Sequence, residues 1–147
     1  MSKLLIKQIS ILSGIFGALF GVLSLIPVIR NIAFLAVILF IAPIIIIYFK
    51  KFNILQEVSS QWGMIIGTIS GIISIIAFML SFTPLDLLLS LFIKDGYIAW
   101  IASFIKNAGF FNYIMILFFL CILNGITNAF SGLTTAYVYD FLKNVKE

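Results

Sequence analysis

The stretch SGIFGALFGVLSLIP, residues Ser13–Pro27, carries the pattern that decides the fold. Small residues recur here four and three positions apart in an apolar run, so they share one face of a helix. This small-residue track, extended by one member toward the N-terminus, comprises Ser10, Gly14, Gly17, Gly21 and Ser24. Lipid supplies no hydrophobic force between helices, so faces that let two backbones approach closely are typical of helix contacts inside membranes. We therefore expect a transmembrane helix whose small face packs on a neighbouring helix.

A second stretch, SGIISIIAFMLSFTP, residues Ser70–Pro84, repeats this arrangement at an offset of 57 positions. The same packing role is predicted for Gly63, Gly67, Gly71, Ser74 and Ser81. Duplication would make the chain two tandem hairpins in the same orientation, an arrangement known in transporters. Convergence is the alternative, because every membrane bundle needs small faces.

The composition excludes an ordinary soluble domain. The 147 residues are 63% hydrophobic and 10% charged, whereas soluble domains are roughly half apolar and a quarter charged. Several uninterrupted apolar runs reach the roughly 20 residues that span a bilayer. The sequence predicts a single all-α transmembrane domain over residues 1–147, with membrane lipids as its surroundings. No basic stripe with interleaved aromatic residues suggests nucleic acid.

Four spans are predicted, and they form two antiparallel hairpins. Only Arg30 and Asn31 separate the first two spans, and so short a link requires a helical hairpin. Pro43 lies inside the second span, where it removes a backbone donor and should kink the helix. The spans cover residues 8–29, 32–49, 62–82 and 113–139.

Residues 85–112 are too apolar for a wet loop and too often interrupted by charges for a fifth span. Two short helices in the outer interface, turning at Lys94-Asp95-Gly96, agree best with this pattern. A re-entrant hairpin is the alternative, but its tip would carry Lys94 and Asp95 into hydrocarbon at about 2.5 kcal/mol or more each.

Basic residues predict the orientation. Six of the nine lie in the two tails and the second loop, and three lie in the other loops. By the positive-inside rule, both termini are cytoplasmic. We expect the plasma (inner) membrane as the location.

The fourth span carries the strongest polar signal. Asn124, Asn128, Ser131 and Thr135 share one helix face,. They could line a polar path, or they could form hydrogen bonds between helices. We favour the structural interpretation, because amides in hydrocarbon need partners.

Catalytic chemistry has little support. The chain has no histidine and a single cysteine, and no pattern of residues predicts a catalytic site, a metal site or a cofactor. We expect a non-enzymatic subunit, accessory or assembly factor of a membrane complex, or a homo-oligomer. The alternative is a transporter or channel module for a small solute or lipid that uses the polar face of the fourth span. A third hypothesis is membrane perturbation, as by toxin or lysis proteins.

Overall fold

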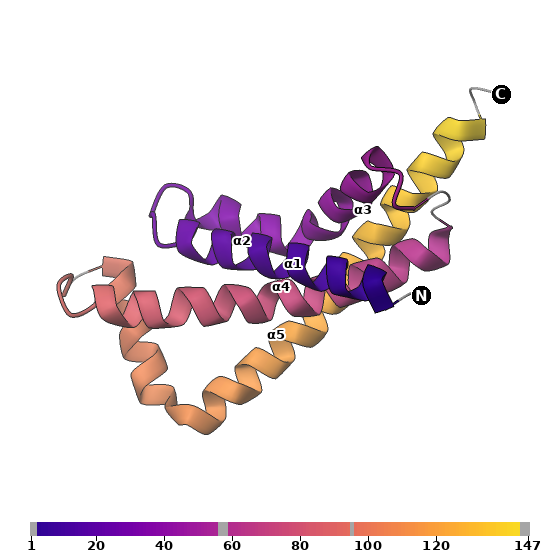
Figure 1. The fold of residues 1–147 in the computed structure, drawn as a ribbon. Coiled ribbons are helices and arrows are strands. Elements are labelled where there is room, and N and C mark those ends of the chain that lie inside the picture. The colour runs from indigo at the N-terminus through magenta and orange to yellow at the C-terminus, as the bar shows by residue number, and fades with distance from the viewer. Residues whose placement is uncertain (1–2, 56–58, 95, 145–147) are drawn as a thin grey trace.

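The computed structural model describes residues 3–55, 59–94 and 96–144. These residues form helices joined by turns, with no strand among them (Figure 1). The helices are α1 (Lys3–Leu23), α2 (Arg30–Leu39), α3 (Ile41–Lys51), α4 (Ser60–Leu89) and α5 (Gly96–Asn144). Three helices, α1, α4 and α5, are long and apolar enough to cross a membrane, and the bent pair α2 and α3 makes a fourth if counted as one span. The predicted all-helical class is confirmed, and these helices have the length and apolar character that a membrane span needs.

Helix α1 ends earlier than the predicted span 8–29. Beyond Leu23 the backbone tightens into turns whose N–H groups bond mostly three residues back. The hydroxyl of Ser24 donates to the carbonyl of Gly21 at 2.7 Å, an acceptor that another helical turn would use,. Pro27 has no N–H to continue the ladder. The connection to α2 is therefore longer than the sequence predicted.

The second span is two helices instead of the single helix predicted over 32–49. Helices α2 and α3 meet at Phe40 and are bent by 62°. Pro43 lies in the first turn of α3, three residues after the break. Its ring lacks an N–H and clashes with the carbonyl four residues back, that of Leu39.

Helix α4 is longer than the predicted span 62–82. Its N-terminus is capped by Ser59, whose hydroxyl accepts from the N–H of Trp62 at 3.4 Å. The predicted stop at Pro84 is wrong, because the helix continues to Leu89. A proline removes only one backbone donor, and the turn that follows still packs against its neighbours.

Of the two short helices predicted in 85–112, only the second forms as a separate segment, and its position relative to the membrane stays a prediction. The first of them is the end of α4, and the second is residues 96–108, the first part of α5. Lys94 lies exposed in the turn between them, and Asp95 lies outside the described residues.

A kink at Gly109 divides α5 into residues 96–108 and residues 110–144. The backbone angles of Gly109 are φ 73° and ψ 164°, a conformation that side chains other than glycine essentially never adopt,. The second part extends the predicted span 113–139 at both ends. The chain therefore makes a sharp turn before the last long helix.

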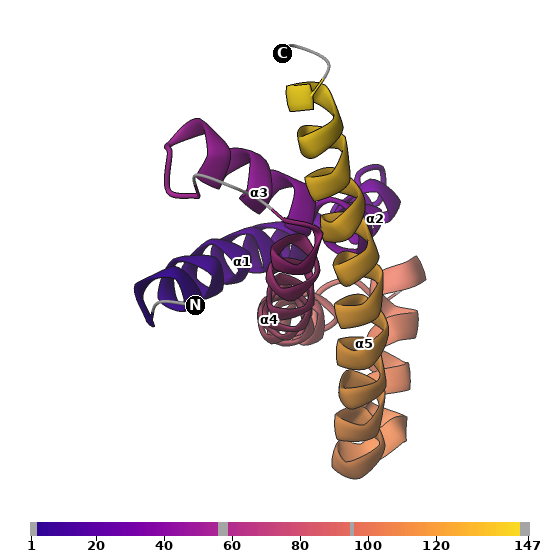
Figure 2. The same cartoon turned by 90° about the vertical axis from the view of Figure 1, so that its right-hand side faces the viewer.

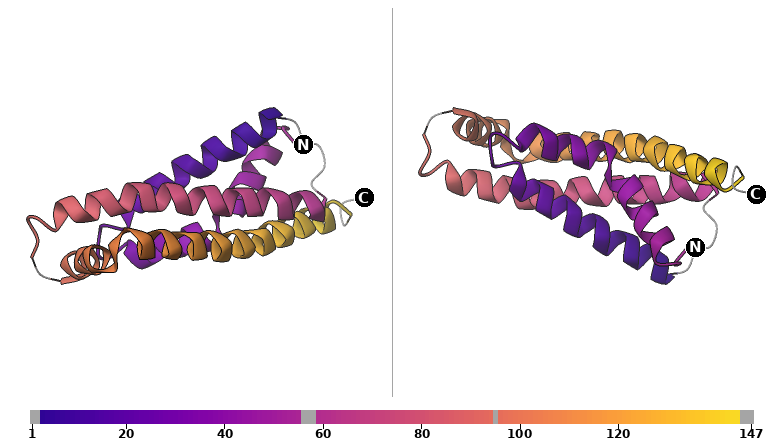
Figure 3. Two further views of the ribbon diagram at one scale, coloured as in Figure 1. Left: turned by 90° about the horizontal axis from the view of Figure 1, so that it is seen from below. Right: turned by 90° about the horizontal axis from the view of Figure 1, so that it is seen from above.

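Helix α1 runs in the same direction as α4, whereas residues 110–144 run in the opposite direction and cross α4 obliquely (Figures 1 and 3). Seen along α4, helix α1 and the second part of α5 lie on either side of it (Figure 2). The described ends of the chain and the α3–α4 connection lie at one end of the bundle. We call the opposite end, which carries the α1–α2 and α4–α5 connections, the distal end.

Two apolar clusters form the core. The larger contains eight buried residues, namely Leu5, Ile9, Ile41, Ile45, Ile46, Phe49, Ile66 and Ala136. The smaller lies toward the distal end and contains Val37, Ile75, Phe78 and Phe82. Helix α3 contributes to the larger cluster and α2 contributes Val37 to the smaller one, so the two parts of the broken span pack in different parts of the core.

Candidate functional site

Asn128 connects α5 to both sides of the break in the second span. Its side-chain nitrogen donates to the carbonyls of Val37 and Ile38, at 3.1 and 2.9 Å. Its side-chain oxygen accepts from the N–H of Ala42, at 3.1 Å. In a continuous helix the N–H of Ala42 would bond to the carbonyl of Ile38. A single amide therefore replaces the hydrogen bonds that the break removes, as hydrocarbon surroundings require.

Neighbouring polar residues of α5 act in the same way. The hydroxyl of Ser131 donates to the carbonyl of Leu39 at 2.6 Å. The side-chain nitrogen of Asn124 donates to the carbonyl of Gly71 at 2.7 Å and to the hydroxyl of Ser74 at 3.3 Å. Both asparagines are fully or almost fully buried. Their side-chain amides form hydrogen bonds between helices and are buried inside the bundle.

Thr135 is separate from this network. Its hydroxyl donates to the carbonyl of Ser131 within its own helix, at 2.8 Å. Thr135 and Ser131 line, with Pro43, a cavity of about 530 Å³ between α3 and α5. The four residues of the predicted polar face thus do not line one continuous opening.

The small-residue track of α1 meets α4. A Cβ atom on Gly17 would lie closer than 3.0 Å to the backbone of Ser74, and one on Gly21 would collide with the hydroxyl of Ser81. That hydroxyl donates across the contact to the carbonyl of Ala18 at 3.1 Å. Glycine is therefore required where these two helices touch.

The glycines of α4 face α5 in the same manner. A Cβ atom at any of the three positions would lie closer than 3.0 Å to the backbone of α5. The contacts pair Gly63 with Gly132, Gly67 with Asn128 and Gly71 with Asn124. Helix α4 is therefore held through two separate small-residue contacts, one on each side.

Gly14 does not contact another helix within the described bundle, since an added Cβ would meet no atom within 4 Å. Ser10 is only half-buried, and its hydroxyl bonds to the carbonyl of Ile6 in its own helix at 2.9 Å. The buried positions of α1 are instead four residues apart, namely Leu5, Ile9, Ser13, Gly17 and Gly21. The contact follows the ridge formed by residues four apart. The predicted track alternates steps of four and three and therefore departs from this ridge.

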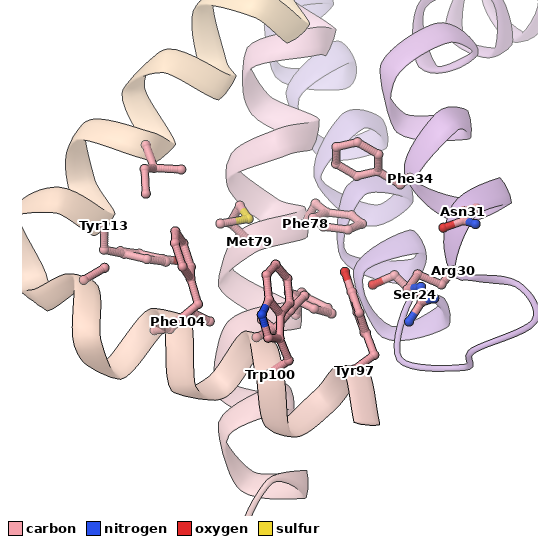
Figure 4. A pocket seen from close by; sticks show the side chains of 15 residues that line it. Ser24, Arg30, Asn31, Phe34, Phe78, Met79, Tyr97, Trp100, Phe104 and Tyr113 are labelled. Carbon is pink, nitrogen blue, oxygen red and sulfur yellow. The ribbon is translucent and has the colours of Figure 1, made fainter. Parts of the chain in front are cut away.

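A pocket of about 300 Å³ lies at the distal end, between α2, α4 and both parts of α5. Because α5 turns back at Gly109, its two parts and α4 surround this space (Figures 1 and 4). The volume is at the lower end of the range for small-molecule sites, roughly 300–1,000 Å³. We call it the distal pocket.

Aromatic side chains supply seven of the fifteen residues that line the distal pocket (Figure 4). They come from three elements, with Phe34 on α2, Phe78 and Phe82 on α4, and Tyr97, Trp100, Phe104 and Tyr113 on α5. Phe78 and Phe82 are buried, whereas Trp100 is 65% exposed at the rim. The hydroxyls of Tyr113 and Thr83 lie 2.8 Å apart and connect α5 to α4 beside the pocket.

Arg30 is the charged residue among the described residues that line the distal pocket. Its guanidinium carbon lies 3.6 Å from the centre of the Tyr97 ring, a cation–π contact,. Ser24 and Asn31 supply the other polar atoms on this side. The pocket therefore has an apolar, aromatic body and a polar, positively charged edge.

Asp86 lies near this edge but does not line the pocket. It belongs to the segment 85–112, for which the sequence predicted two short outer helices, but the structure places it inside α4. Its carboxylate is fully buried, and neither oxygen has a hydrogen-bond partner among the described residues.

The sequence analysis did not predict the distal pocket. A signal was present, because Tyr97, Trp100 and Phe104 are spaced three and four residues apart and so share a helix face,. The walls from α2 and α4 come from distant parts of the sequence, so no local pattern could reveal the enclosed space.

Comparisons with known protein families, with curated proteins and with solved structures found no match. Within the described part of the chain, no group of three His, Cys, Asp or Glu residues could hold a metal ion. The function must therefore be argued from the geometry of the sites themselves.

Proposed function

We propose that this chain is a non-enzymatic integral membrane protein that binds a membrane amphiphile in the distal pocket. The observation that carries the proposal is the shape and chemistry of that pocket. An apolar wall of aromatic rings with a small number of polar groups at one edge is typical of sites for small amphipathic ligands.

A matched pair of substitutions tests this proposal. Ala108 lines the distal pocket, and Ala99 lies on the same helix but lines a different cavity. We expect Ala108→Phe to fill the pocket and abolish retention of co-purifying amphiphile, whereas Ala99→Phe retains it. Native mass spectrometry in mild detergent measures the retained mass, and equal retention in both variants would contradict the proposal.

Association with a second copy or with other membrane subunits is the second candidate function. It is supported by the open space beside Gly14, where a partner helix could approach closely,. Gly17 and Gly67 cannot test it, since larger side chains there would disturb the bundle itself. Gly14→Leu is the appropriate variant, and loss of a defined oligomer in native mass spectra is the expected result.

Transport along the polar face of α5 has less support. The amides of Asn124 and Asn128 already hold hydrogen bonds to neighbouring helices. The cavity beside Pro43 is the feature that favours this proposal.

The proposal includes a topology of four spans in two hairpins, with both termini in the cytoplasm of the plasma (inner) membrane. The distribution of basic residues along the sequence supports it, with six of nine in the two tails and the second predicted loop,. A tandem repeat is supported by one contact. Gly17 and Ser74, which are equivalent positions at the offset of 57, lie directly against each other.

A further inference from the structure

We propose that the amphiphile in the distal pocket is an anionic phospholipid, with one acyl chain in the aromatic pocket and its phosphate beside Arg30. This inference rests on the proposed function, since it names the class of ligand for that same pocket.

The charge of the pocket edge is the first argument. Arg30 is the charged group among the described lining residues, and it is positive. Its guanidinium carbon lies over the Tyr97 ring, and the N–H groups of a guanidinium are suited to bind two oxygens of one phosphate.

The second argument is that Arg30 has no acidic partner among the described residues. The structure describes two acidic residues, Asp86 and Asp140. Among the described residues neither oxygen of Asp86 has a hydrogen-bond partner, so it forms no ion pair with Arg30, and Asp140 lies in the last turns of α5, near the other end of the molecule. The described part of the chain thus leaves the guanidinium of Arg30 without an anion.

The polar groups around Arg30 are the third argument. Arg30 is the first residue of α2, and the residue before that helix, Ile29, provides no side-chain cap. The partial positive charge of a helix N-terminus therefore lies on the same side of the pocket as the guanidinium. Asn31, the next residue, also lines the pocket and can donate to a phosphate oxygen,.

The apolar body of the pocket favours a lipid over a free anion. Phe78 and Phe82 are buried in its wall, and the exposed ring of Trp100 lies at its rim. Tryptophan prefers the headgroup region of a bilayer. An acyl chain is apolar and can fill the aromatic part of the pocket without burying an unpaired polar group. Inorganic phosphate would bind only at the polar edge and leave the aromatic part empty.

The test uses the full chain in phosphatidylcholine nanodiscs that contain a minor fraction of phosphatidylglycerol. Native mass spectrometry after release into mild detergent gives the ratio of the two lipids that remain bound. We expect enrichment of phosphatidylglycerol on the native protein. In Arg30→Gln we expect about fivefold less enrichment with a lipid still bound, since one basic residue near anionic lipid contributes roughly this factor.

Controls separate the headgroup assignment from general charge and from misfolding. Lys94→Gln removes another positive charge from the distal end, where Lys94 is exposed and lines a different cavity, and should change the enrichment less than twofold. Arg30→Lys should retain part of the enrichment. Circular dichroism should show unchanged helix content in all three variants.

The outcomes are distinguishable. Equal enrichment in Arg30→Gln and the native protein, with binding lost in Ala108→Phe, would overturn the headgroup assignment and leave the proposed function standing. Retained lipid in Ala108→Phe would overturn both. Displacement of the lipid by inorganic phosphate would overturn the choice of a phospholipid over a free anion.

Discussion

Each glycine of the bundle has a different environment, although the sequence presents them as one track. Gly67 lies against the backbone of Asn128, where no Cβ atom fits, whereas Gly14 has open space around it. The two residues therefore differ in what a methyl group would meet, and the difference can be measured as stability.

We expect Gly67→Ala to destabilise the protein by about 1–3 kcal/mol, because the added atom forces two closely packed backbones apart. Gly14→Ala is the matched control and should stabilise the helix by about 0.5–1 kcal/mol, since alanine loses less backbone entropy than glycine. Unfolding in mixed SDS and dodecyl maltoside micelles gives both values. Equal effects at the two positions would show that α4 and α5 are not in close contact.

At the scale of helices, the break in the second span is the feature that organises its neighbours. Pro43 removes one backbone donor, but the break lies three residues earlier, at Phe40. The carbonyls and the N–H left free there are bonded by Asn128 and Ser131 from α5. The bend is therefore a joint property of a proline and of a different helix that supplies the missing partners.

Asn128→Leu should destabilise the protein by about 1–3 kcal/mol, because it leaves buried carbonyls and an N–H without partners. The matched control is Thr127→Val on the same helix, where the lost hydroxyl bonds only within its own helix, to Leu123. We expect the control to change stability by less than about 0.5 kcal/mol. The same unfolding assay measures both, and a neutral Asn128→Leu would contradict the bridging role.

The kink at Gly109 determines where residues 96–108 lie, and hence the shape of the distal pocket. Gly109→Ala should cost about 1–3 kcal/mol in the observed backbone conformation. An added Cβ would meet no atom within 4 Å, so the cost comes from the backbone alone. The chain can relieve it by moving the helix that carries Trp100.

That movement should shift the fluorescence maximum of Trp100 in a Trp62→Phe background. Gly96→Ala serves as the comparison, since Gly96 also has positive φ and open space but is the first residue of α5, away from the kink. An unshifted spectrum together with unchanged stability in Gly109→Ala would show that the kink does not depend on glycine.

For the whole molecule, the central question is whether the bent pair crosses the membrane. Four spans place the α1–α2 connection opposite the α3–α4 connection, whereas a re-entrant pair would place both on one side. Val28 and Phe52 mark these two connections, and both are exposed.

We expect cysteines introduced at positions 28 and 52, each in a Cys121→Ser background, to react with an impermeant thiol reagent from opposite sides of the membrane. A third cysteine at position 92, in the α4–α5 connection, should react from the same side as position 28. Reaction of positions 28 and 52 from the same side would exclude the hairpin of the first two spans.

The sequence by itself determined the surroundings that the helices need, a membrane, and the kind of contact between them, which is through small residues. Long apolar runs require a membrane, and glycine and serine at helical spacing require close helix contacts, because both follow from composition along a single chain. Most of the predicted contact residues, such as Gly17 and Gly67, do lie between helices.

Only the tertiary structure decided which helix each small face meets, where the second span breaks, and that a pocket exists. The contact of α1 with α4 bypasses Gly14, because the packing of α4 on α1 follows a ridge of α1 residues spaced four apart. The helix passes through Pro84, with buried residues before and after it, Phe82 and Asp86, that hold it against the bundle. The pocket is built from residues as distant as Phe34 and Phe104, and such an enclosure depends on how elements pack in space, which local sequence periodicity does not encode.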